Sequence, residues 1–160
     1  MGTLNVTGVG GTTGHPSNGR VPYLVENTID LSAIRADTGP DNADILQALD
    51  LPAETLVMFA GIEVLTACSS SVTLDLGITG TTAGFSDADA YVDGYDATGA
   101  TYAPILSVLK LQVKVAETLD VLIGGADSSA GKIRVWAILC DISGSSETDT
   151  NTDSQHDTVS

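Results

Sequence analysis

Apolar and polar residues alternate along much of this chain, and this period of two is the feature that most restricts its fold. In residues 107–115, one parity holds Leu109, Leu111, Val113 and Val115. In residues 72–78, one parity holds Val72, Leu74, Leu76 and Ile78. Because successive side chains of a strand point to opposite faces, both patterns predict strands that are buried on one side.

Two longer apolar runs predict more deeply buried strands. They span residues 56–65 and 132–140, and the second begins as an alternation before it becomes apolar on both faces. Weaker strand patterns span residues 23–31, 102–106 and 119–123. Turn-forming sequences separate these runs at residues 51–54, 69–71, 124–125 and 127–131. Many short strands joined by such turns predict an all-β fold, a β-sandwich or jelly roll.

Residues 41–49 fit two interpretations. Asp41 or Asn42 would cap a short helix that carries Ile45 and its apolar neighbours on one side. A strand that ends at Pro52 fits equally well, because proline stops either element. Both alternatives stay open at the level of the sequence.

The composition divides the chain into three parts. Residues 1–20 are rich in Gly and Thr, and residues 143–160 consist mostly of Ser, Thr, Asp and Asn. Neither segment has enough apolar residues to form a core, so we expect an extended N-terminal arm and an acidic C-terminal tail. Residues 21–142 are expected to form a single sandwich domain, since a chain of 160 residues is of the usual size for one domain.

The charge is strongly acidic, with 21 Asp and Glu against 6 Lys and Arg and a net charge of -15. Such a surface repels nucleic acid phosphates and anionic membranes, so neither is an expected partner. No apolar run approaches the ~18 residues that indicate a membrane span, and the N-terminus lacks the pattern of a signal peptide. We expect the protein to be made in the cytoplasm and used there or in a particle assembled there.

Residues for catalysis are scarce. The two histidines, His15 and His156, both lie in the terminal segments, where a catalytic triad would be hard to hold. The two cysteines, Cys68 and Cys140, are too far from each other and from the histidines for the usual zinc-site spacing. The sequence therefore predicts no catalytic residues, no cofactor and no metal-binding residues, and hence a protein that is not an enzyme.

One acidic cluster invites a metal interpretation. Its carboxylates are Asp87, Asp89, Asp93 and Asp96. An exposed, solvated loop is the simpler interpretation, and a calcium site is the alternative because calcium prefers several hard oxygen ligands. The EF-hand pattern fails here, since Tyr91 and Val92 occupy places that need a polar ligand and a glycine.

Three further features carry structural expectations. Cys68 and Cys140 are expected to be reduced core thiols, and a disulfide stays open if their strands are neighbours. Trp136 is expected in the core or in a contact between subunits. The basic residues form two pairs that each share a strand face: Lys110 with Lys114, and Lys132 with Arg134. We expect them to pair across strands with acidic residues such as Asp120, Asp75 or Glu63, or to form a small stripe that faces an acidic partner.

Several segments together carry a resemblance to a known class of protein. They are Leu4-Asn5-Val6-Thr7-Gly8, Thr12-Thr13-Gly14-His15-Pro16, the stretch from Leu49 to Val57, Gly61 to Ala67, Val72 to Gly77, and Asp89 to Gly94. In these segments, about two thirds of the chain, the sequence resembles small structural proteins encoded near the head genes of tailed bacteriophages. These motifs are structural and contain no catalytic residues.

The resemblance implies a virion component, with capsid decoration (cement) as the leading hypothesis. In that role the protein binds the major capsid protein on the capsid surface and clamps neighbouring capsomers. Open strand edges carry few Lys and little Pro, so we also expect a homo-oligomer, with a trimer as the leading form. The alternative is a tail or fibre module that binds a receptor or carbohydrate, although an aromatic content of 4% weighs against carbohydrate.

Overall fold

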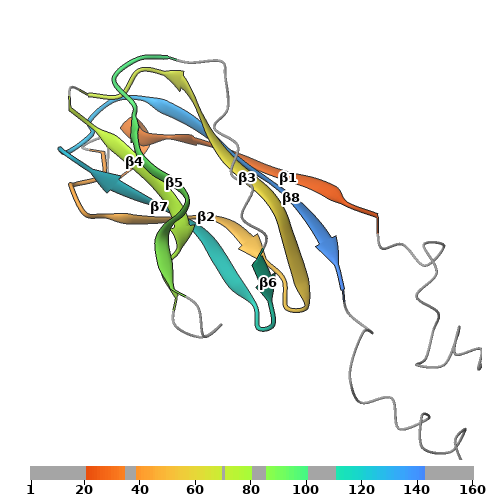
Figure 1. Cartoon of the computed structure of the whole chain (residues 1–160). Coiled ribbons are helices and arrows are strands. Elements are labelled where there is room, and N and C mark those ends of the chain that lie inside the picture. Colours follow the sequence, from red (N-terminus) through yellow and green to blue (C-terminus); the bar gives the residue numbers. More distant parts are fainter. Residues whose placement is uncertain (1–20, 35–38, 70, 81–85, 101–110, 143–160) are drawn as a thin grey trace, which may run out of the picture.

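Two four-stranded antiparallel sheets face each other in the computed structural model (Figure 1). The structure describes residues 21–34, 39–69, 71–80, 86–100 and 111–142. Sheet A has the strand order β1-β8-β3-β6, and sheet B has the order β2-β7-β4-β5. This is the arrangement of an eight-stranded jelly roll, in which the chain passes between the two packed sheets at every step except from β4 to β5. The all-β sandwich predicted from the alternating pattern is confirmed.

The strands have the following bounds. Sheet A contains β1 (Tyr23–Asp30), β8 (Lys132–Asp141), β3 (Thr55–Thr66) and β6 (Leu111–Val113). Sheet B contains β2 (Ile45–Leu51), β7 (Glu117–Gly124), β4 (Thr73–Ile78) and β5 (Asp87–Asp96). The helical element of the described ranges is one 3-10 turn, η2 (Leu31–Ala33), and no helix there is long and apolar enough to cross a membrane.

The core lies between the two sheets and is built from the alternating residues. In sheet B, the predicted face Val72, Leu74, Leu76 and Ile78 is fully buried. In sheet A, β8 buries Ile133, Val135, Ala137 and Leu139. Since every second residue of a strand points to the same side, these two sets face one another and exclude water from the centre of the domain.

The prediction for residues 107–115 is wrong at Val115. Strand β6 ends at Val113, which is fully buried, whereas the Val115 side chain is 44% exposed. Strand β6 belongs to sheet A and β7 to sheet B, so the residues between them carry the chain across the end of the sandwich. A side chain in that connection has no opposite sheet to pack against. Residues 101–110 lie outside the described ranges, and so does the strand predicted at 102–106.

Residues 41–49 form the end of a turn and the first part of a strand. The Ala43 amide donates to the Ile123 carbonyl oxygen over 2.8 Å, and β2 begins at Ile45. Strand β2 then pairs with β7 and ends at Leu51, directly before Pro52. The helix alternative is therefore wrong and the strand alternative is right, because pairing with β7 satisfies the backbone groups that a helix would satisfy internally.

The three-part division of the chain is tested only in its middle part. The sandwich fills the described ranges between residues 21 and 142. Residues 1–20 and 143–160 lie outside those ranges, so the arm and the tail stay predictions. Strand β1 begins beside the end of β8, with Tyr23 opposite Leu139, so the first and last described strands start and end at the same end of sheet A.

Replacing Leu74 with alanine tests the core. We expect Leu74→Ala to lower the free energy of unfolding by about 2–5 kcal/mol, because it removes fully buried methyl groups and leaves a cavity between the sheets. Val115→Ala serves as the control and should change it by no more than about 0.5 kcal/mol, since Val115 is an exposed turn residue. Urea denaturation of both variants measures the difference, and equal losses would contradict this account of the core.

Candidate functional site

The described residues contain no assembled catalytic or metal centre. Both histidines, His15 and His156, lie outside the described ranges. Within those ranges, no group of three or more His, Cys, Asp or Glu side chains is placed to hold a metal ion. The candidate site must therefore be sought in the surfaces that the sandwich presents to other molecules.

Charge is divided unequally between the two sheets. The four strands of sheet B carry no lysine or arginine. Their acidic residues are Asp50, Asp75, Asp87, Asp89, Asp93, Asp96, Glu117 and Asp120. The strands of sheet A carry Glu26, Asp30, Glu63 and Asp141 together with Lys132 and Arg134. Sheet B is therefore the acidic side of the molecule, and sheet A is closer to charge balance.

The acidic segment from Asp87 to Asp96 is an edge strand, β5, and the loop interpretation is wrong. Asp and Gly are poor strand formers, but pairing with β4 overrides that preference. The register shifts twice along this pair, so β5 is strongly bulged. Gly77 of β4 lies so close to β5 that an added Cβ would be 2.0 Å from the Asp87 carbonyl oxygen. The carboxylates are thus spread along a strand.

Two carboxylates of β5 have individual partners that explain their pKa shifts. Asp96 Oδ1 accepts hydrogen bonds from the Thr98 amide over 2.9 Å and the Thr98 hydroxyl over 2.6 Å, and these bonds lower the pKa of Asp96. A hydrogen bond with the neighbouring Asp89 carboxyl raises the pKa of Asp87. Neither pattern supplies the several converging oxygens that calcium needs.

The cations of sheet A are paired on its outer face. Arg134 Nη2 donates to the buried Glu63 carboxylate directly opposite on β3, and Nη1 lies 4.0 Å from Glu26 Oε2. Lys132 Nζ lies 3.7 Å from Asp30 Oδ2. The predicted cross-strand pairing is therefore confirmed for Glu63. Lys132 and Arg134 do not form the predicted basic stripe, because acidic side chains of the same sheet match both charges.

The other two predicted acidic partners, Asp75 and Asp120, are wrong because both belong to sheet B. Asp75 accepts a hydrogen bond from the Gly94 amide, and Asp120 accepts one from the Thr79 amide over 3.1 Å. Lys114 instead lies 3.8 Å from Glu54, in the connection at the end of the sandwich. Lys110 lies outside the described residues.

Neither of the two cysteines forms a disulfide, and only one belongs to the core. Cys68 is buried, and burial raises the pKa of its thiol. Cys140 is half-buried on the outer face of sheet A, because the neighbouring Leu139 takes the inward position of β8. The prediction of two core thiols is right for Cys68 and wrong for Cys140.

Trp136 lies on the outer face of sheet A, so the core interpretation is wrong. It stands between Glu26 of β1 and Gly61 of β3 and is half-buried. One step further along the same three strands, Leu24, Ile138 and Phe59 lie side by side. Aromatic and other apolar side chains on an outer face are enriched in contacts between proteins. That Trp136 lies in a contact between subunits therefore stays a prediction.

The edge strands of the two sheets, β1 and β2, meet along one side of the molecule. Of the large apolar residues most exposed in the described ranges, Val21, Tyr23 and Leu24 lie at the start of β1 and Ile45 at the start of β2, whereas Val115 lies between β6 and β7. A groove of about 600 Å³ opens between the two strands. It is lined by Asn27, Ile29, Ile34, Ile45, Leu46 and Gln47. The sequence analysis did not find this β1–β2 groove.

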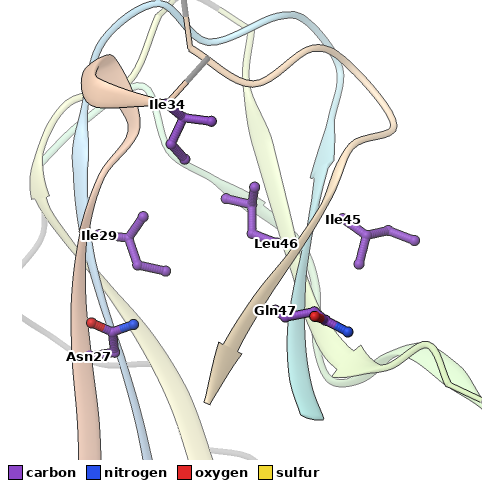
Figure 2. A pocket seen from close by; sticks show the side chains of 6 residues that line it. All are labelled: Asn27, Ile29, Ile34, Ile45, Leu46 and Gln47. Atoms are coloured by element: carbon purple, nitrogen blue, oxygen red, sulfur yellow. The ribbon is translucent and has the colours of Figure 1, made fainter. Parts of the chain in front are cut away.

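Figure 2 shows how the lining residues lie. Ile29, Ile34 and Leu46 occupy the space between the strands, and Ile45 and Gln47 lie on the other side of β2. Asn27 Nδ2 donates to the Ala48 carbonyl oxygen over 3.0 Å and so ties β1 to β2 across the two sheets. The groove is thus lined by both apolar and polar groups, with a polar link between its two walls.

Strand β1 is the most regular sheet edge in the described part of the chain. It pairs with β8 through eight consecutive residues without a register shift. The other edge strands are protected: β2 and β5 contain bulges, and β6 has three residues. A long, flat edge has a row of backbone N–H and C=O groups that can accept another strand.

The comparisons with known proteins concern the fold. No protein-family model matches the chain, and no curated protein matches it in sequence. The chain is similar to a chain of the acidic stable capsid structure of Helicobacter pylori bacteriophage KHP30, with 12% identity and a TM-score of 0.56 over 77% of this chain and 90% of that chain. It is also similar to a chain of the cyanophage Pam1 capsid asymmetric unit, with 18% identity and a TM-score of 0.57 over 81% and 93%.

At these identities the likeness shows a shared fold. It extends over nearly the whole of each matched chain, so the sandwich corresponds to a complete unit in both capsid structures. Both matched chains belong to bacteriophage capsid structures.

The buried Glu63 makes Arg134 a sensitive position. We expect Arg134→Gln to lower the free energy of unfolding by about 1–3 kcal/mol, because it leaves the Glu63 carboxylate, whose side chain is 7% exposed, without its counter-ion. Lys132→Gln is the matched control and should cost less than about 1 kcal/mol, since its ion pair with Asp30 is nearly half exposed on both sides. Thermal melts of both variants compare them, and a smaller loss for Arg134→Gln would contradict the pairing.

The two thiols should differ in reactivity. We expect Cys140 to react with a thiol reagent in the folded protein at neutral pH, and Cys68 to react only after denaturation, because burial shields Cys68 and raises the pKa of its thiol. Mass spectrometry of peptides after timed alkylation measures both rates. Equal rates, or a disulfide between the two, would overturn this assignment.

Proposed function

We propose that this protein is a structural component of a bacteriophage virion that decorates the capsid surface and stabilises the head by binding the major capsid protein. The observation that carries this proposal is the fold, which matches nearly complete chains of two phage capsid structures.

The distribution of charge supports a protein with one binding side and one solvent side. Acidic residues without cations make sheet B a surface that stays hydrated. The outer face of sheet A and the β1–β2 groove have apolar residues, and the charges beside them are paired. Paired charges can be covered by a partner at a lower cost than isolated ones, so we place the contacts within the virion on this side.

We also propose that the protein acts as a homo-oligomer, with a trimer as the expected form, and that it is made in the host cytoplasm before it joins the head. The Gly-rich segment 1–20 would then lie on neighbouring subunits of the assembly. The exposed edge of β1 and the apolar residues around it are the features that support association.

Binding to purified phage parts tests the function. Full-length protein should saturate heads that lack it and raise the temperature at which these heads break open, because a ligand that binds only the intact state stabilises it. Purified tails are the control and should bind no more than background. Binding to tails or host cells in place of heads would favour the alternative tail or fibre module and overturn the decoration proposal.

A further inference from the structure

From the geometry of the β1–β2 groove we infer that it is the docking site for the first 14 residues of a second copy of this chain. The inference rests on the self-association in the proposed function and names its surface and its occupant. Two observations on the receiving side support it: the groove is lined by Ile29, Ile34 and Leu46, and it adjoins the free edge of β1.

The receiving side fits an extended chain. Strand β1 is eight residues long and unbulged, so its free edge is about 26 Å of regular backbone that can pair with an added strand. A strand added to such an edge gains main-chain hydrogen bonds, and alternate side chains enter the neighbouring pockets. The apolar groove beside β1 supplies those pockets.

The N-terminal segment has the sequence of such a strand. Leu4 and Val6 alternate with Asn5 and Thr7, which places two apolar side chains on one face of an extended chain. The glycines that follow have no side chains to obstruct a narrow groove. Ordering this chain costs about 1–2 kcal/mol per residue, which requires many main-chain bonds in return. An open sheet edge offers them.

Charge selects this segment over the other segment outside the described ranges. All 21 acidic residues of the chain lie after residue 20, and the first 20 residues contain none and include Arg20. The C-terminal segment carries Glu147, Asp149, Asp153 and Asp157 without a single Lys or Arg. Since the whole chain has a net charge of -15, a second copy repels that tail at long range, whereas the first 14 residues carry no acidic side chain to repel.

Two features favour a second copy over the chain's own segment. Val21, Tyr23 and Leu24 are exposed where β1 begins, and the body of another copy would cover them. The chain's own segment would have to reverse direction immediately before β1 to lie along it, whereas a segment from another copy can approach without a turn. Twenty extended residues reach on the order of 60 Å, enough to cross from one body to the next.

Sedimentation velocity of the full-length protein without any phage particle tests this inference. We expect Ile34→Asp in the groove and Leu4→Asp/Val6→Asp in the segment each to weaken self-association by at least about tenfold, because each places a carboxylate in an apolar contact. Ile34 is only partly buried, directly after the η2 turn, so Ile34→Asp should keep the far-UV circular dichroism of the folded protein.

Two controls carry the same added charges elsewhere. Val115→Asp changes an exposed apolar residue near the end of β2, whereas the groove lies at its start. Ser146→Asp/Thr148→Asp adds two carboxylates at the same spacing to the C-terminal segment. Both should change self-association by less than about threefold, the range expected of exposed charges. If a control weakens it as much as its test variant, net charge is the cause and the inference is wrong.

The remaining outcomes also decide the question. Loss in Ile34→Asp alone means that the groove meets the body of another copy. Loss in the segment variant alone means that the segment docks elsewhere. Either result overturns the inference. A wild-type monomer whose melting temperature falls with Leu4→Asp/Val6→Asp places the segment on its own body and overturns it too. Since no phage head is present, these results are independent of the head-binding test.

Discussion

The packing of the central strands of the two sheets is the interaction on which the rest of the molecule depends. Strands β8 and β3 of sheet A and β7 and β4 of sheet B supply most of the fully buried side chains. Every feature of the surface is set by this packing, because it decides which parity of each strand faces inward. Trp136 and Cys140 reach the outer face for that reason, since Val135 and Leu139 fill the core beside them. Buried apolar area is also the dominant favourable term in folding.

The division of charge gives this sandwich two different sides. Sheet B has acidic residues and no lysine or arginine in its strands, so two copies that approach through it repel one another. Sheet A has its cations matched by Glu26, Asp30 and Glu63, and its outer face carries apolar residues. A protein with a net charge of -15 therefore has one side on which another acidic molecule can dock at low electrostatic cost. The β1–β2 groove lies on the border of that side, where β1 ends sheet A.

The sequence predicted strands best where the pattern was long and regular. The alternation of Val72 to Ile78 and the apolar run from Leu56 to Leu65 were enough to predict these two strands. Their apolar residues can be buried only if one particular face of each strand packs against the opposite sheet. It failed where tertiary pairing overrides local preference. The Asp-rich segment 87–96 looks like a loop in isolation, yet β4 recruits it as an edge strand. Val115 continues a perfect alternation, yet the chain leaves the sheet at Val113.

The sequence by itself determined the all-β class and most of the core, since these follow from the periodicity of its apolar residues. Only the tertiary structure decided which strands are neighbours, and with them the Arg134–Glu63 pair, the acidic sheet B and the β1–β2 groove. The residues that form that groove come from two strands in different sheets, separated by the η2 turn and the chain that follows it. A local sequence pattern cannot predict that β1 and β2 lie side by side, because their proximity depends on how the two sheets pack and on which strands form their edges.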